Sequence, residues 1–367
     1  MPYKAEEPSV SWIANDSDLK QAVASFDAVV GIDSEFKRTN TFYPIPALYQ
    51  VASQAEVFLV DPLCIQDWSP FTAFLEDHSY RKIFHACQED LELLASHLSV
   101  SPKNVFDTQF AYAFLSDSYS LSYANLVEEI LEVSLQKNET RSDWLQRPLS
   151  SAQVEYAVED VLYLVDVYRS LEEKLEEKSR LDWVVEDNED RTVYKEVEPS
   201  EYYRNIKRAW QLEGKSLAIL KDLGEWREMK ARSANVPRRR VIWDEHLVDF
   251  AKNNLLTEQE IREALPRSIV DEYGGEILQA YKKGASAEPP DVIARPLSGH
   301  QNRVVKQLRE VALKKAQNLG FSVELIGRKK DLEELVRNYE ATRELSEYYV
   351  GWREQVVASE FLTILSR

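Results

Sequence analysis

The sequence predicts a mixed α/β domain followed by an all-helical part. Short apolar segments rich in β-branched and aromatic residues, which are typical of strands, occur in the first half of the chain and are almost absent after residue 203. Helical periodicity occurs between these strand-like segments and after them. In the second half of the chain it is the main pattern. A Pro-, Gly- and Ser-rich stretch at 285–299 divides the helical part into two units of similar length.

Strand signals come first along the chain. The segments expected to be strands are 27–33, 47–52, 55–61 and 82–86. Each is short and is followed by polar residues or by a helical pattern, so strands and helices alternate. This order indicates one α/β domain with a mixed sheet.

Two helices of this domain carry clear signals. After the last predicted strand, one helix face carries an apolar stripe. It is formed by Leu91, Leu94, Ala95 and Leu98, which follow the i, i+3, i+4, i+7 spacing of a helix. Farther on, Ser150 and Gln153 have the spacing of a capping box, which predicts the start of a long helix that continues to about Glu177.

Composition changes mark the boundaries between domains. The predicted boundaries are 1–183 for the α/β domain, 184–203 for an acidic linker, 204–284 for the first helical domain, 285–299 for a hinge and 300–367 for the second helical domain. We expect the acidic domain to stay folded when residues 204–367 are removed.

The charge of the chain is unevenly distributed. Residues 1–200 hold 16 Lys and Arg against 37 Asp and Glu, a balance of −21, whereas residues 201–367 hold 29 against 26, a balance of +3. The second half can therefore approach phosphate groups without net repulsion. Two cysteines exclude a disulfide framework. The absence of an export signal and of long apolar runs predicts a cytoplasmic protein without a membrane segment.

Five residues form the candidate catalytic group. Asp33 and Glu35 end the first predicted strand with i, i+2 spacing, so their carboxylates point to one side. Asp90 lies in the first turn of a helix, and Tyr156 and Asp160 share one helix face. Taken singly, each has an ordinary structural explanation. The acids at the strand end could be solvated, and Asp90 could simply favour the start of its helix. Tyr156 could flank the core with an exposed acid beside it.

Their combination resembles a known family. The motifs GIDSEFKRT, HACQEDLELL and EYAVEDVLYL resemble, in this order, those of ribonuclease D and the wider DEDDy exonucleases. In that family these motifs supply four carboxylates and one tyrosine, which correspond to Asp33, Glu35, Asp90, Asp160 and Tyr156. Beyond the linker, LGEWREMKARSANVPRRRVIWDEHLVDFAK resembles an HRDC domain, and a more divergent copy would end near GWREQVV.

The resemblance implies a ribonuclease H-like exonuclease domain and two HRDC-like modules. It further implies a 3′→5′ exoribonuclease that trims structured RNA such as tRNA precursors and releases nucleoside 5′-monophosphates, with no obligate protein partner. Four converging carboxylates would repel one another unless cations neutralise them. Oxygen ligands without His or Cys suit Mg²⁺ or Mn²⁺, and two such divalent metal ions would serve phosphodiester hydrolysis.

Several other residues have weaker claims to a role. His85 precedes the second motif and is expected to be a core histidine that shapes the site. Phe36 could stack on a terminal base. The basic run Arg238, Arg239 and Arg240 is a candidate for phosphate contacts or else a solvated loop.

Two rival functions remain open at this stage. A DNA exonuclease would use the same metal chemistry, because the choice of sugar depends on contacts that the sequence does not reveal. A non-catalytic RNA-binding protein could keep the fold, although such a protein would usually have lost at least one of the five site residues.

Overall fold

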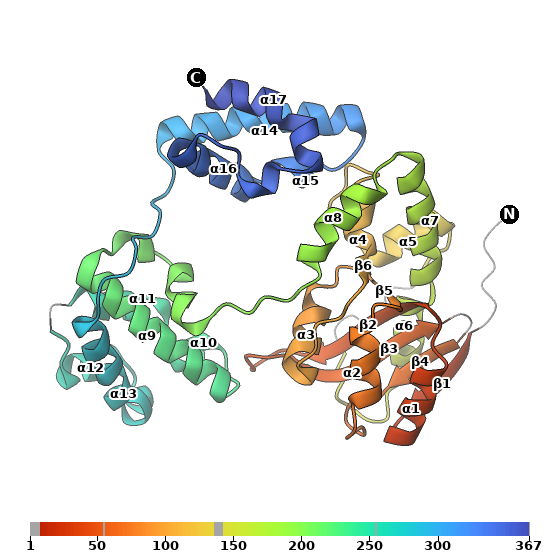
Figure 1. Cartoon of the computed structure of the whole chain (residues 1–367). Helices are drawn as coiled ribbons and strands as arrows, with labels where there is room; N and C mark the ends of the chain where they lie inside the picture. Colours follow the sequence, from red (N-terminus) through yellow and green to blue (C-terminus); the bar gives the residue numbers. More distant parts are fainter. Residues whose placement is uncertain (1–7, 54–55, 136–141, 254, 367) are drawn as a thin grey trace. The chain divides into compact units, whose positions relative to one another are not determined.

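The computed structural model describes residues 8–53, 56–135, 142–253 and 255–366 (Figure 1). Most of the N-terminal stretch used to judge export, residues 1–7, lies outside these ranges. The chain divides into two compact units. The first unit comprises Met1–Lys37, Pro46–Tyr194 and Leu297–Arg367, and the second comprises Arg38–Ile45 and Lys195–Pro296. None of the described helices is long and apolar enough to cross a membrane.

A six-stranded mixed sheet forms the centre of the first unit, in the order β1-β4-β3-β2-β5-β6. The strands are β1 (Ser9–Ile13), β2 (Val29–Lys37), β3 (Ile45–Ser53), β4 (Glu56–Val60), β5 (Arg81–Phe84) and β6 (Val105–Asp107). β1 pairs with β4 in parallel, as do β5 with β2 and β6, whereas β3 and β4 are antiparallel. The four predicted strands are confirmed. The edge strands β1 and β6 were not among the predicted strands.

Helices cover both faces of the sheet. Side chains of a strand point alternately to the two faces, so each strand contributes residues to both cores. Phe58 and Val60 belong to the core on one side, and Val57 and Leu59 belong to the core on the other. The helices of this α/β part are α1 (Asp16–Ala24), α2 (Ser69–Glu76), α3 (Gln88–Leu98), α4 (Thr108–Tyr112), α5 (Tyr123–Leu131), α6 (Ser151–Leu162), α7 (Leu164–Glu177) and α8 (Leu181–Arg191).

The long helix predicted from Ser150 is divided into α6 and α7. Its capping box is confirmed, with Ser150 and Gln153 each bonding the backbone N–H of the other. The helix breaks at Tyr163, whose backbone N–H donates to the Tyr123 hydroxyl at 3.2 Å. At the break the helices pack directly on β2, where a Cβ on Gly31 would lie 2.8 Å from the Leu164 Cβ. Glycine thus allows the junction of α6 and α7 to approach β2 closely.

The predicted acidic linker at 184–203 is wrong in its first part, because α8 continues to Arg191. Val184 is fully enclosed by the core. The side-chain amide of Asn188 donates to the carbonyl oxygen of Val105 on the edge strand β6. The high acid content suggested a linker, but the inward-facing residues pack this segment against the domain as a helix.

The C-terminal helices share a core with the α/β part. They are α14 (Gly299–Leu319), α15 (Glu324–Gly327), α16 (Lys329–Thr342), the 3-10 helix η3 (Glu347–Tyr349) and α17 (Trp352–Leu365). Trp352 stacks on Trp183 of α8, with ring centroids 4.8 Å apart. The buried Arg180 guanidinium donates to the carbonyl oxygens of Phe114 and Leu319, so it joins both parts. This arrangement argues against the expectation that the acidic domain folds without residues 204–367.

The second unit is helical and has its own core. Its elements are the 3-10 helices η1 (Pro199–Asn205) and η2 (Ala209–Gln211) and the helices α9 (Gly214–Ser233), α10 (Arg238–Val241), α11 (Asp244–Lys252), α12 (Glu258–Ala264) and α13 (Arg267–Ser286). The segment Arg38–Ile45 belongs to this unit. Phe42 is part of its core, and the backbone N–H groups of Phe42 and Tyr43 both donate to the Asn235 side-chain oxygen.

Candidate active site

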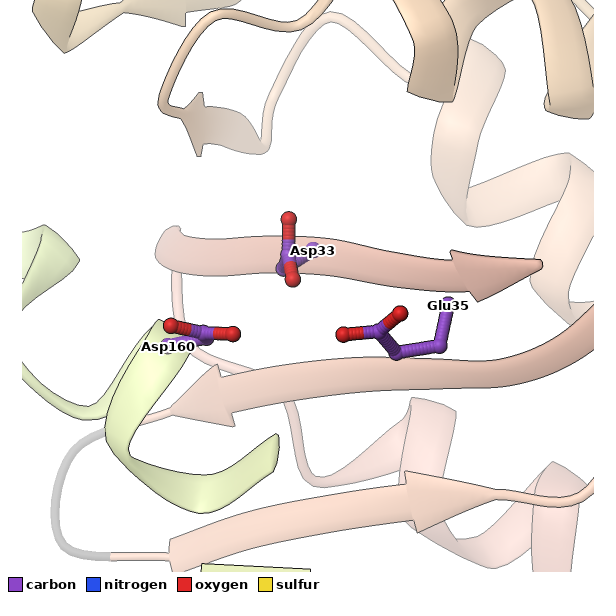
Figure 2. Close-up of side chains that lie close together, drawn as sticks. All are labelled: Asp33, Glu35 and Asp160. Atoms are coloured by element: carbon purple, nitrogen blue, oxygen red, sulfur yellow. The ribbon is translucent and has the colours of Figure 1, made fainter. Parts of the chain in front are cut away.

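Three carboxylates meet at the centre of the sheet. Asp33 and Glu35 both lie on β2, and Asp160 comes from α6 (Figure 2). One oxygen atom from each of the three lies within 4.8 Å of the others. In Figure 2 the carboxylates of Glu35 and Asp160 point toward each other beside Asp33. The i, i+2 spacing on a strand therefore does bring two acids to one side, and the third is added by the helix that packs on Gly31.

Asp90 completes the acidic group. It lies in the first turn of α3 and is only 7% exposed. Its carboxylate accepts a hydrogen bond from the Ser34 hydroxyl, so it is attached to the strand that carries Asp33 and Glu35. Its charge raises the pKa of both neighbouring carboxyls on β2. Asp90 thus lies close enough to act on Asp33 and Glu35 through its charge, whereas the oxygens that lie within 4.8 Å of one another belong to Asp33, Glu35 and Asp160.

The site strongly disfavours four negative charges. Burial, followed by repulsion from the other acids, raises the pKa of Glu35 to about 8 and holds the pKa of Asp33 well above its usual range. Burial likewise raises the pKa values of Asp90 and Asp160 to about 7. Hard divalent cations prefer oxygen ligands, which these carboxylates supply. Such cations would also neutralise the clustered negative charges that raise the pKa values. The residues present therefore fit a metal centre.

Tyr156 lies one turn before Asp160 on α6, and its hydroxyl is close enough to the Asp160 carboxylate for the two groups to affect each other's pKa. Burial and the negative charges of Asp160 and Glu35 raise the pKa of the phenol far above its usual value. Tyr156 therefore remains a protonated hydrogen-bond donor at neutral pH, next to the acids.

His85 lies in a different environment from the acids. Its Nδ1 bonds the Thr108 hydroxyl at 3.0 Å and its Nε2 bonds the Leu121 carbonyl oxygen at 3.0 Å. Burial lowers the pKa of the ring, which favours the neutral form. Both ring nitrogens are occupied within the protein, as expected of a core histidine, and a role in shaping the site remains a prediction.

The weaker candidates are placed as follows. Phe36 is half-buried against the core of the α/β part. Arg238 pairs with the buried Glu228 through two contacts of 2.5 Å and lies over the Phe42 and Tyr202 rings, so it is largely occupied within the second unit. Arg239 and Arg240 are exposed.

Ser34 and Trp144 were not among the sequence-based site residues. Ser34 stands between two acids, and strand alternation places it on the opposite side from them, so only the fold reveals its bond to Asp90. Trp144 precedes α6, and its ring centroid lies 5.9 Å from that of Tyr156. No short spacing in the sequence links either residue to its partner.

Comparisons with known proteins show which domains and which fold this chain shares with them. A family model described as a 3′-5′ exonuclease matches residues 10–176, and the HRDC domain model matches residues 216–281. Ribonuclease D of Pseudomonas paraeruginosa is 36% identical over 370 residues, with 98% of each chain covered. The crystal structure of Escherichia coli RNase D superposes with a TM-score of 0.88 at 30% identity and covers 98% of this chain and 99% of that one. A protein from Bifidobacterium adolescentis shares the fold, with a TM-score of 0.62 at 18% identity.

The mixed sheet with its clustered carboxylates, together with the matching domain model, defines a 3′→5′ exonuclease. The near full-length similarity goes further: the chain belongs to the ribonuclease D family. It is thus a hydrolase and a 3′→5′ exoribonuclease, which confirms the fold class and the activity expected from the sequence. That residues 300–367 form a second HRDC-like domain remains a prediction.

The acidic group should make metal-free protein less stable as pH rises. In the unfolded chain these carboxyls titrate near pH 4, roughly as free side chains do. Because the folded-state pKa values of Asp90, Asp160 and Glu35 are about 7, 7 and 8, the folded state holds extra protons between pH 4 and 8. The contribution of these groups to the free energy of unfolding is therefore fully present below pH 4. It falls as pH rises above 4 and is lost once pH has passed through 7–8.

A bound divalent cation would replace those protons. We therefore expect Mg²⁺ to raise the Tm more at pH 8.5 than at pH 6, by a difference of at least roughly 2–4 °C. Thermal unfolding with EDTA and with Mg²⁺ at both pH values measures this difference, and Asp160→Asn should reduce it. An equal gain at the two pH values would contradict a metal site at these carboxyls.

Proposed function

We propose that this site hydrolyses the terminal phosphodiester bond at the 3′ end of structured RNA, including tRNA precursors with 3′ extensions. The observation that carries the proposal is the clustering of Asp33, Glu35 and Asp160 within 4.8 Å, with Asp90 and Tyr156 beside them. All five belong to one compact unit.

Asp33, Glu35, Asp90 and Asp160 would hold two divalent metal ions, Mg²⁺ or Mn²⁺, because these ions prefer oxygen ligands. When bound, such a pair neutralises the carboxylates and stabilises charge on the attacking and leaving oxygens. The Ser34 hydroxyl keeps the Asp90 carboxylate turned toward β2. The carboxylates thus supply the ligands, and the strand and helix contacts supply their spacing.

Tyr156 would orient the attacking water through its protonated hydroxyl. In the reaction, the water oxygen forms a bond to the terminal phosphorus while the bond between phosphorus and the 3′ oxygen of the preceding nucleotide breaks. The water loses a proton to solvent, and the leaving 3′ oxygen gains one. The products are a nucleoside 5′-monophosphate and an RNA that is one nucleotide shorter and ends in a free 3′-OH.

Structured RNA is proposed as the substrate because the Escherichia coli relative is described as an exoribonuclease involved in structured RNA processing. Membership of the ribonuclease D family favours RNA over the rival DNA substrate. Arg239 and Arg240 are exposed on the second unit and would contact phosphates there, with Arg238 as a weaker candidate. Phe36 would stack on a terminal base. A cytoplasmic location and the lack of an obligate protein partner remain predictions.

Digestion of a tRNA precursor tests the substrate. A precursor with a single-stranded 3′ extension, labelled at its 5′ end, should shorten one nucleotide at a time in Mg²⁺ and slow sharply near the mature end. A DNA strand of the same sequence should react at least about tenfold more slowly, because 2′-OH contacts distinguish the sugars. Equal rates on both strands would favour the DNA exonuclease.

A further inference from the structure

We propose that Arg147 is a positioning residue for the reaction: it anchors the segment 143–147 to the sheet and thereby sets the orientation of Tyr156 through Trp144. The inference rests on the proposed role of Tyr156 and adds to it the part of the fold that holds the phenol in place.

The Arg147 guanidinium joins three separate parts of the chain. Its Nε and Nη2 each donate to Asp61 at 2.7 Å, directly after β4, and its Nη2 also donates to the Ala47 carbonyl oxygen on β3 at 2.6 Å. Its Nη1 donates to the carbonyl oxygens of Trp144 and Gln146 at 2.8 and 2.9 Å. A planar fork with this many donors suits such a junction, and lysine could not reproduce it.

The partner of the fork is a buried acid. Asp61 is 3% exposed. Burial alone would raise its pKa, but hydrogen bonds from Arg147 and from the Leu63 backbone N–H outweigh burial and lower it. The pair is therefore ionised and fixed to the rigid sheet, which gives the segment 143–147 an anchor independent of the active site.

The anchored segment ends in contact with Tyr156. Trp144 is 4% exposed, and its ring meets that of Tyr156 at a centroid distance of 5.9 Å and an angle of 44°. The same segment is tied to the start of α6, because Gln153 donates to the Asp143 carbonyl oxygen at 3.4 Å. Arg147 thus holds the backbone of the residue whose side chain packs on the phenol.

This contact restrains the orientation of the phenol. The packed indole limits rotation of the Tyr156 ring, whose hydroxyl is directed to the neighbourhood of the Asp160 carboxylate. A shift of about 1 Å in a group that orients the nucleophile can slow a reaction by up to roughly 100-fold. Loss of the Arg147 fork should therefore lower the rate of cleavage while leaving RNA affinity unchanged.

A double-mutant cycle tests this coupling in the full chain. Single-turnover cleavage of a single-stranded RNA is measured for the wild type, Arg147→Lys, Tyr156→Phe and the double variant. We expect Tyr156→Phe to slow cleavage by roughly 10- to 1,000-fold, and Arg147→Lys to slow it by about tenfold. In the Tyr156→Phe background, Arg147→Lys should slow it further by less than about twofold, since the phenol that it positions is gone. RNA Kd should stay within about twofold throughout.

Further variants separate positioning from folding. Trp144→Phe keeps the Arg147 contacts but changes the ring against Tyr156, so it should show the same dependence on Tyr156. Arg169→Lys, at an exposed arginine paired with Asp166 on α7, is the matched control and should cleave at the wild-type rate in both backgrounds. The Tm of each variant shows whether the fold is retained.

The possible results distinguish the two proposals. If Tyr156→Phe is slow and both Arg147→Lys and Trp144→Phe act equally in the two backgrounds, Arg147 only supports the fold and the inference is overturned, while the role of Tyr156 stands. If Tyr156→Phe cleaves at the wild-type rate, the proposed role of Tyr156 fails and the inference fails with it.

Discussion

Asp33→Asn and Asp160→Asn are expected to lose nuclease activity by roughly 1,000-fold or more while the protein remains folded. Each change removes a charged oxygen ligand but leaves the side chain almost the same size, and the loss of even one well-placed charged or polar group commonly costs 100- to 1,000-fold. The metal-free protein should become more stable at pH 8, because burial and repulsion raise the pKa of both carboxyls.

Single-turnover digestion of a labelled RNA in Mg²⁺, together with thermal unfolding in EDTA at pH 8, measures both effects. Glu155→Gln is the matched control, since Glu155 is an exposed acid on the same helix as Asp160. It should change neither the rate nor the Tm appreciably. A rate near that of the wild type for either site variant would remove the assignment of these carboxylates.

Removal of residues 297–367 is expected to unfold the α/β part, although these residues contribute no predicted catalytic group. Trp352 and Phe321 are almost fully buried in the same core as the sheet. Truncation would expose that surface and leave the Arg180 guanidinium without the Leu319 carbonyl oxygen. Losing several large buried side chains at about 3–5 kcal/mol each exceeds the total stability of most domains.

Circular dichroism and size-exclusion chromatography of the truncated chain measure this loss. A milder variant, Arg180→Ala, should lower the Tm of the full chain, because two carbonyl oxygens lose their donor in a buried place. A truncated protein that is monomeric, cooperatively folded and as active as the full chain would show that the C-terminal helices are an independent module.

The sequence predicts the site better than it predicts the arrangement around it. Asp33 and Glu35 follow from strand periodicity, and Tyr156 and Asp160 from helix periodicity, because these relations are local. That Asp90 belongs with them came from the order of motifs shared with a family. The contact between Ser34 and Asp90 spans 56 residues, and no local rule reveals such a pair.

The fold shows the same division between local and distant features. Apolar, β-branched segments marked four strands and the capping box marked the start of α6, but the break at Tyr163 depends on the Tyr123 hydroxyl, 40 residues away. The acid-rich α8 was taken for a linker because its segment is acidic and poor in apolar residues, whereas its contacts through Val184 and Asn188 depend on distant parts of the chain. The shared core of the C-terminal helices was missed, since an amphipathic helix does not reveal which surface will cover it.

The central claim, that this site removes nucleotides from a free 3′ end, is tested most directly by blocking that end. One RNA is prepared with a 3′-OH, with a 3′-phosphate and as a closed circle, and each form is incubated with the protein in Mg²⁺ or in EDTA. The 3′-OH form should be degraded to nucleoside 5′-monophosphates in Mg²⁺ only, and the circle should stay intact. The 3′-phosphate should slow degradation by at least about 100-fold, because a displaced terminal nucleotide loses its alignment with the attacking water. Efficient cutting of the circle, or equal degradation in EDTA, would contradict a metal-dependent 3′→5′ exonuclease.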